Sequence, residues 1–294
     1  MHWFILGGYL LACILFLGGA TLLRVRGRRD RQPFAAGQRL LRGPGESLRR
    51  RLQLHRQSEL ADILAAFVLP VLASVVFFQI VTRLEETGQL LALLAAAFAL
   101  AAALAFLLRR LLGRINHARN LYLGHFGERV VAESLEPLKA GGHLVFHDMP
   151  AGETGDDFNL DHVIVGPRGV FAIETKTRRQ SPRSAGFMLH EIIHDGQVLA
   201  FPWGEDRHGL DQALRQARWL QELIARETGI STPVRPLLTF PGWTIVRRGD
   251  GPVRVLAPAD IPAAVDADDT ASLTPGQASR IATLLDARCR DVEY

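Results

Sequence analysis

Three long apolar runs constrain this chain of 294 residues more than any other feature. They cover residues 3–23, 63–81 and 89–108, and none has an ionisable residue near its centre. A helix of about 20 residues rises ~30 Å, the thickness of the hydrocarbon core of a bilayer. We therefore predict an all-α membrane region of three transmembrane helices over residues 1–114, followed by a separate domain over residues 115–294.

The charges that flank these runs predict which side of the membrane each part occupies. The loop 24–60 holds 11 arginines against three acidic residues, and Arg109, Arg110 and Arg114 follow the third run. Basic loops stay in the cytoplasm under the positive-inside rule. We therefore expect a multi-pass protein of a bacterial-type inner (plasma) membrane, with its N-terminus outside and its C-terminal domain cytoplasmic.

The basic loop itself has two interpretations. Residues 46–60 could form a basic amphipathic helix on anionic membrane lipid, which would make lipid a partner. Alternatively the loop is a solvated segment that only fixes the topology, and we favour this second interpretation. Residues 115–294 hold 19 basic and 24 acidic residues, so the domain is net acidic. An acidic domain argues against a broad nucleic-acid-binding surface.

A predicted β-hairpin concentrates the polar chemistry of the domain. Two β-branched apolar runs, 160–165 and 170–175, flank a turn that reads Gly-Pro-Arg-Gly. If Val165 and Val170 close this turn, the numbers of paired residues sum to 335.

That register places Asp161 directly opposite Glu174, with Cβ atoms roughly 5 Å apart. Lys176 lies two residues beyond Glu174 and therefore faces the same side of the sheet. The sequence alone thus gathers two carboxylates and one ammonium at the end of an apolar hairpin.

Two neighbouring carboxylates repel each other unless they share a proton or a cation. Oxygen ligands suit Mg²⁺ or Mn²⁺, which can activate a water and offset negative charge at phosphorus. The alternative is a cross-strand ion network on a wetted sheet face, and on the residues alone the two interpretations weigh about evenly. Only two of the 34 basic residues are lysines, Lys139 and Lys176. Retention of a compact ammonium beside two acids favours a functional site.

Three arginines follow the hairpin closely. Arg178, Arg179 and Arg183 could contact substrate phosphate groups, or they could be exposed residues of a turn. His162 adjoins Asp161 but points to the opposite sheet face, so we expect it to be a packing residue rather than a base.

Residues of about 120–240 resemble the nuclease-related (NERD) domain, a branch of the PD-(D/E)xK nuclease superfamily. The resemblance rests on four motifs in the order typical of that family. They are Gly124-His-Phe-Gly127-Glu128, Asp161-His-Val-Ile-Val165, Ile173-Glu174-Thr175-Lys176 and Leu210-Asp-Gln212-Ala-Leu-Arg-Gln216.

The resemblance implies an α/β fold of restriction-endonuclease-like architecture, a mixed sheet flanked by helices. It implies Mg²⁺-dependent (or Mn²⁺-dependent) hydrolysis of phosphodiester bonds in DNA or RNA, with no small-molecule cofactor. Several roles follow by resemblance. Asp161 and Glu174 would ligate the metal together with the Thr175 carbonyl. Lys176 would position the attacking water, and Glu128 would complete the acidic cluster. Gln216, or else Gln212, would support the site.

Two other functions remain open. The first is a catalytically silent, membrane-tethered module of the same fold that binds nucleic acid or protein, which the acidic charge favours. The second is a phosphate-binding domain or nucleotide phosphatase. Glu128 also has a simpler interpretation, an acid in the first turn of a helix.

Hydrophobic periodicity predicts the remaining elements of the domain. We expect helices over 115–139, 210–226 and 274–289, and strands over 141–148, 188–193, 198–201, 234–240, 243–246 and 253–256.

Overall fold

The computed structural model describes residues 38–55, 77, 79, 86–152, 158–179 and 190–293. The chain divides into two compact units, residues 1–40 with 292–294 and residues 41–291. The second unit contains every motif discussed below. The predicted span 3–23 and nearly all of the span 63–81 lie outside the described residues.

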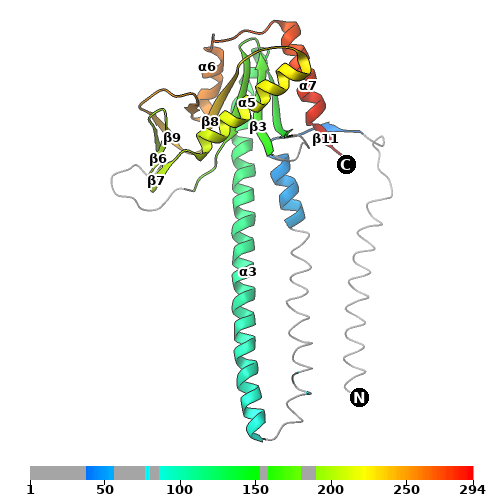
Figure 1. The fold of residues 1–294 in the computed structure, drawn as a ribbon, viewed down its shortest axis with the longest axis vertical. Coiled ribbons are helices and arrows are strands. Elements are labelled where there is room, and N and C mark those ends of the chain that lie inside the picture. Colours follow the sequence, from blue (N-terminus) through cyan, green and yellow to red (C-terminus); the bar gives the residue numbers. More distant parts are fainter. Residues whose placement is uncertain are drawn as a thin grey trace. The chain divides into compact units, whose positions relative to one another are not determined.

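A single helix of 50 residues, α3 (Glu86–Leu135), joins the third apolar run to the domain (Figure 1). We predicted two separate helices here, and the structure shows one, because the intervening stretch is rich in Leu and Arg and contains no proline. The helical run Gly88–Ala140, which covers most of α3, is the one in the described part of the chain that is long and apolar enough to cross a membrane.

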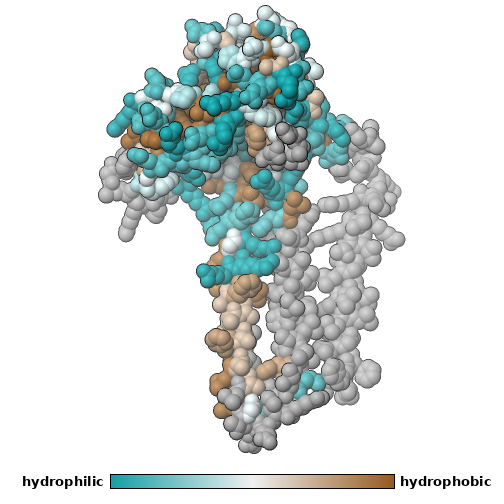
Figure 2. Space-filling model, in the orientation of Figure 1, coloured by the Kyte–Doolittle hydropathy of each residue, from teal (hydrophilic) through white to brown (hydrophobic). Residues whose placement is uncertain are grey.

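The apolar part of α3 exposes its side chains rather than burying them. Phe98 is 78% exposed and Phe106 is 63% exposed. Figure 2 shows a hydrophobic surface along the part of α3 that lies far from the domain, whereas the domain surface in this view is largely hydrophilic. A core helix of a globular domain would bury such residues.

A five-stranded mixed sheet forms the centre of the domain, with the order β10-β8-β4-β3-β2. Strands β2, β3 and β4 pair in antiparallel fashion, and β4, β8 and β10 pair in parallel. This confirms the predicted mixed α/β sheet. The strands are β2 (Leu144–Ala151), β3 (Phe158–Gly166), β4 (Gly169–Thr175), β8 (Val234–Thr239) and β10 (Arg254–Leu256).

Helices cover both faces of this sheet because alternate side chains of the central strands point in opposite directions. On one face, Val163 and Ala172 pack with Leu220 of α5 (His208–Thr228) and with α7 (Pro275–Cys289). On the other face, Ile164 and Phe171 pack with residues of α3, α4 (Pro137–Ala140) and α6 (Ile261–Asp266). Strands buried on both faces explain the continuous apolar runs in the sequence.

A second sheet of four strands has the order β7-β6-β5-β9. Its strands are β5 (Glu191–His194), β6 (Leu199–Phe201), β7 (Gly204–Asp206) and β9 (Thr244–Arg247). The sequence predicted the β5–β6 hairpin and β9, but it did not indicate β7 or a separate sheet. The remaining elements are β1 (Leu40–Leu41), which pairs with β11 (Arg290–Val292), and a 3-10 turn at Pro258–Asp260.

The ends of several elements follow simple local rules. Gly229 adopts a left-handed conformation (φ 69°) at the end of α5, which is the usual role of glycine after a helix. Thr274 and Gln277 form a capping box at the start of α7. The predicted strand 141–148 begins later, at Leu144, because residues 141–143 terminate α4.

Candidate active site

The register of the β3–β4 hairpin is the one that the sequence predicted. Val165 pairs with Val170 and His162 pairs with Ile173, so paired numbers sum to 335. Gly166 and Gly169 also pair, so the loop between them is only two residues long. The next position along this register is Asp161, opposite Glu174.

Asp161 is fixed by the backbone of the opposite strand. Its Oδ2 accepts a hydrogen bond of 2.6 Å from the backbone N–H of Thr175. The pKa of Asp161 is raised well above its ordinary value, first by burial and then by the charges of Glu174 and Glu128. The hydrogen bond from Thr175 opposes this shift without cancelling it.

Glu174 and Lys176 form an ion pair within the buried end of the hairpin. Lys176 Nζ lies 2.6 Å from Glu174 Oε1, and the Glu174 side chain is only 2% exposed. Lys176 Nζ also donates to Gln212 Oε1 of α5 at 2.8 Å. Burial raises the pKa of Glu174 in spite of Lys176, and its Oε2 is buried with no hydrogen-bond partner.

Glu128 enters the site from α3. The helix approaches closely here because Gly127 has no side chain: a Cβ at Gly127 would lie 2.1 Å from Thr177 Cγ2. Burial, followed by the charges of Asp148 and Glu174, raises the pKa of Glu128 to about 8, while a backbone hydrogen bond from Gly45 acts in the opposite direction. Its Oε2 is buried without a hydrogen-bond partner.

The predicted supporting residues also lie around this cluster. Gln212 contacts Lys176 directly, and Gln216 is buried, donates to the Asn159 carbonyl at 3.2 Å and lowers the pKa of Glu174. Thr175 holds Asp161 through its N–H, and its hydroxyl is buried without a partner.

The arginines that follow Lys176 point to neighbouring elements. Arg178 pairs with Asp206 at 3.1 Å and Arg179 donates to Asn120 of α3 at 2.9 Å. Arg183 lies outside the described residues.

His162 does not take part in the cluster, as the sequence indicated. Its Nδ1 lies 2.8 Å from Nδ1 of His147, and the two rings meet edge to face. Burial lowers the pKa of His147 to about 4 and lowers the pKa of His162 as well. Both rings are therefore neutral at pH 7 and act as packing residues.

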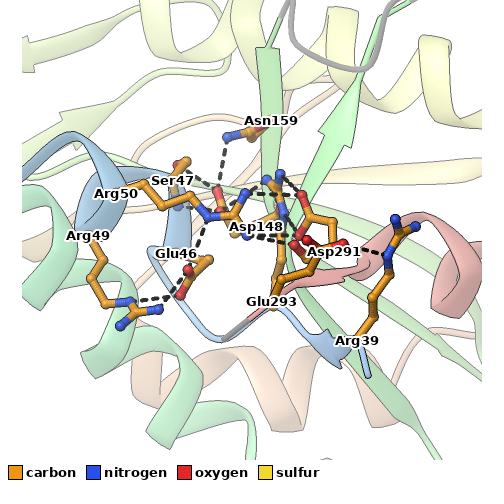
Figure 3. A network of polar contacts seen from close by, with 10 residues as sticks. Arg39, Glu46, Ser47, Arg49, Arg50, Asp148, Asn159, Asp291 and Glu293 are labelled. Atoms are coloured by element: carbon orange, nitrogen blue, oxygen red, sulfur yellow. Dashed lines mark hydrogen bonds and ion pairs between the residues drawn. The ribbon is translucent and has the colours of Figure 1, made fainter. Parts of the chain in front are cut away.

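Sequence reasoning missed Asp148, which anchors residues 41–55 to the domain (Figure 3). Asp148 is 1% exposed and accepts from Ser47 N at 2.6 Å and Ser47 Oγ at 2.7 Å. Arg42, which is 8% exposed, lies 3.3 Å from Asp148 and also pairs with Asp291.

Neither interpretation of the basic loop included a contact with the domain. The structure shows that Arg42 and Ser47 contact buried Asp148, and that a helix runs over residues 46–55. The sequence indicated this contact through the opposite net charges of the loop 24–60 (+8) and of residues 115–294 (−5).

The cluster has the chemistry of a site for a hard cation. Three carboxyl groups with raised pKa values face one ammonium, and two of them have a buried oxygen without a partner. In the described ranges, no group of three or more His, Cys, Asp or Glu residues is arranged to hold a metal ion. Mg²⁺ needs only one or two carboxylates because it keeps several waters, so Asp161 and Glu174 fit it.

Comparison with protein families matches residues 123–241 to the family described as nuclease-related domain (NERD). No match was found among the curated proteins or among the solved structures.

Proposed function

From the premise that residues 123–241 are a nuclease-related domain, we propose that this protein is a membrane-anchored, Mg²⁺-dependent nuclease that hydrolyses phosphodiester bonds in nucleic acid. The observation that carries the proposal is the buried cluster at the end of the β3–β4 hairpin. Asp161 and Glu174 directly follow His162 and Ile173, the last pair of the register; Asp161 is held by the N–H of Thr175, and Lys176 lies 2.6 Å from Glu174. A surface ion network would be exposed, whereas Glu174 is 2% exposed.

The chain's own residues account for most of the proposed chemistry. Asp161 and Glu174 would hold the divalent ion, Mg²⁺ or Mn²⁺, whose bound form supplies an activated water and offsets charge at phosphorus. Lys176 is held between Glu174 and Gln212, so its ammonium has a fixed position from which it can orient the attacking water. Glu128 adds a third carboxyl group that exchanges its proton near neutral pH.

Lys176 differs from the other lysine in a way that supports this role. Lys139 makes an ordinary pair with Glu136 on the surface, and both side chains are more than half exposed. Lys176 is 21% exposed and its partner is buried. Surface ion pairs such as Lys139–Glu136 are common and contribute little to stability. A partly buried pair beside two further carboxyl groups, as at Lys176, is more typical of a functional site.

Membrane anchoring is supported by α3, which continues without a break from the apolar run into the domain. Residues 41–55 and the nuclease-related domain also belong to one compact unit. The chain between them must therefore return to the side from which it started, which the two predicted spans 63–81 and 89–108 would achieve. With the positive-inside rule, we propose that this side is the cytoplasm.

Cleavage by the full-length protein in detergent tests this proposal. Single- and double-stranded DNA and RNA are incubated with Mg²⁺ or Mn²⁺. We expect the wild type to cleave at least one substrate, and we expect Asp161→Ala and Lys176→Ala to lose cleavage. Asp269→Ala, which removes an exposed acid elsewhere, is the matched control. Circular dichroism checks that each variant is folded.

A silent binding module is the second candidate, because the domain is net acidic. Such a module would bind no divalent ion in a way that depends on Asp161. A wild type that is inert on all four substrates with both ions would contradict catalysis and favour this candidate.

A further inference from the structure

A groove with a volume of about 510 Å³ runs between the helix 46–55 and α3. Its apolar walls include Leu52 from the first helix and Ala118 and Leu123 from α3. The groove therefore exists only because the segment 41–55 packs on the domain.

Two aromatic side chains of the groove are largely exposed. Tyr122 is 62% exposed and Phe126 is 54% exposed. They are four residues apart on α3, so they lie on the same side of the helix, one turn from each other. Among the described residues 115–293, only one other aromatic residue is comparably exposed, Trp203 of the second sheet. The groove thus gathers most of the exposed aromatic surface of the domain.

The charge of the groove is opposite to that of the domain. Arg119 and Arg179 line it, and no Asp or Glu does. Arg119 lies on the same side of α3 as Tyr122 and Phe126, at spacings of three and seven residues. Flat apolar surfaces beside guanidinium groups suit an anionic ligand that has exposed planar rings.

The groove leads toward the acidic cluster. Arg179 follows Lys176 by three residues and bonds Asn120, whereas Thr177 meets Gly127. The segment after β4 therefore runs along α3 from residue 127 to residue 120. Phe126 and Glu128 are two residues apart on α3 and point to different sides of the helix. The link from the groove to the acidic cluster is therefore the segment between Lys176 and Arg179.

We propose that this groove binds a single-stranded segment of nucleic acid and directs it to the acidic cluster. Bases stack on Tyr122 and Phe126, and phosphate groups lie against Arg119 and Arg179. The strand must be unpaired, because the faces of bases in a duplex are covered by their neighbours. This inference deepens the proposed nuclease function and rests on it.

Fluorescence anisotropy on the full-length protein in nanodiscs of phosphatidylcholine tests the inference. The probe is a fluorescein-labelled oligothymidylate, and EDTA separates binding from cleavage. We expect Tyr122→Ala and Phe126→Ala each to weaken binding about tenfold, since stacking on one aromatic ring contributes that order of affinity. Tyr122→Phe keeps the ring and should bind as the wild type does. Arg179→Ala should weaken binding and reduce its salt dependence.

Two controls match these variants at exposed sites away from the groove. Trp203→Leu removes an exposed aromatic ring and Arg226→Ala removes an exposed guanidinium, and neither should change binding. Equal loss of binding in Tyr122→Phe and Tyr122→Ala would overturn the stacking argument.

Other outcomes separate this inference from the proposed function. Cleavage by the wild type with unchanged binding in Tyr122→Ala and Phe126→Ala would overturn the groove and leave the nuclease proposal intact. Ring-dependent binding of the oligothymidylate without cleavage would support the groove and contradict catalysis. Binding to phosphatidylglycerol vesicles that depends on the two rings, without binding to the oligothymidylate, would show a lipid-contacting surface and overturn the inference.

Discussion

Replacement of Arg42 by alanine tests whether the segment 41–55 is part of the folded domain. The Arg42 side chain is 7% exposed and links two acids. Its Nη1 reaches the Asp148 carbonyl at 3.1 Å and the Asp148 carboxylate at 3.3 Å, and its Nε donates to Asp291 at 2.7 Å. Removal of Arg42 leaves the carboxylate of Asp148, which is 2% exposed, without its cation.

The expected loss of stability is about 3 kcal/mol. Breaking a buried ion pair by removing one partner costs roughly 3–5 kcal/mol. The lower end applies because Asp148 keeps hydrogen bonds from Ser47 and Asn159. The pair with Asp291, which is 35% exposed, adds no more than about 1 kcal/mol because solvent screens it. For a domain of this size, we expect the melting temperature to fall by about 6–12 °C.

The difference between variant and wild type should also depend on pH. Burial already raises the pKa of Asp148, and the loss of Arg42 raises this pKa further. When its pKa is raised, Asp148 keeps a proton in the folded state that it releases in the unfolded chain. The folded state therefore loses stability as pH rises above the ordinary pKa of an aspartate. In the wild type, Arg42 and, to a smaller extent, Arg50 lower the pKa of Asp291 to about 2, which stabilises the fold above pH ~4. Both effects make the deficit larger at pH 7 than at pH 3.

Urea unfolding followed by tryptophan fluorescence measures the free energy of unfolding. Arg49→Ala is the matched control, because Arg49 is about half exposed and pairs only within its own helix. The double variant Arg42→Ala, Asp148→Asn should recover part of the loss, since asparagine tolerates the positive φ of residue 148 and carries no charge. An Arg42→Ala protein within 1 kcal/mol of the wild type would refute the view that residues 41–55 belong to the folded unit.

Two further predictions concern the acidic cluster. Gly127→Ala should reduce cleavage about tenfold or more, because its Cβ would overlap Thr177 Cγ2 and displace Glu128 from the hairpin. Adding Thr177→Ser to this variant removes the methyl group and should restore activity. Failure of this rescue would contradict the steric explanation. In the absence of divalent ions, stability should fall as pH rises from about 4.5 to about 8, since folded Glu128 keeps a proton that the unfolded chain has released. Thermal unfolding of Glu128→Gln across this range should show a flatter dependence, and an unchanged slope would show that another group titrates.

The sequence predicted those features that depend on local periodicity. The two apolar, β-branched runs and the glycines around Pro167 predicted the register of the hairpin from Val165 with Val170 to His162 with Ile173. The apolar stripe and the glycine after its end located α5. These are short-range signals, and one turn or one helix suffices to contain them.

Features that depend on contacts between distant segments were not predicted. Nothing near Asp148 in the sequence indicates that it accepts hydrogen bonds from Ser47, 101 residues earlier. The division of the strands into two sheets likewise depends on pairing across long separations, such as Glu191 with Thr244. The two helices expected over 89–108 and 115–139 form one helix, because a cluster of arginines does not by itself end a helix.

Binding of a divalent ion tests the central claim most directly. Isothermal titration of Mn²⁺ into the full-length protein should show a site that disappears in Asp161→Asn and persists in Asp269→Asn, a control at an exposed acid. The unpartnered oxygens of Glu174 and Glu128 and the raised pKa values of the cluster predict this result. Equal binding by Asp161→Asn and the wild type, or no binding by either, would contradict a metal-dependent site at the end of the hairpin.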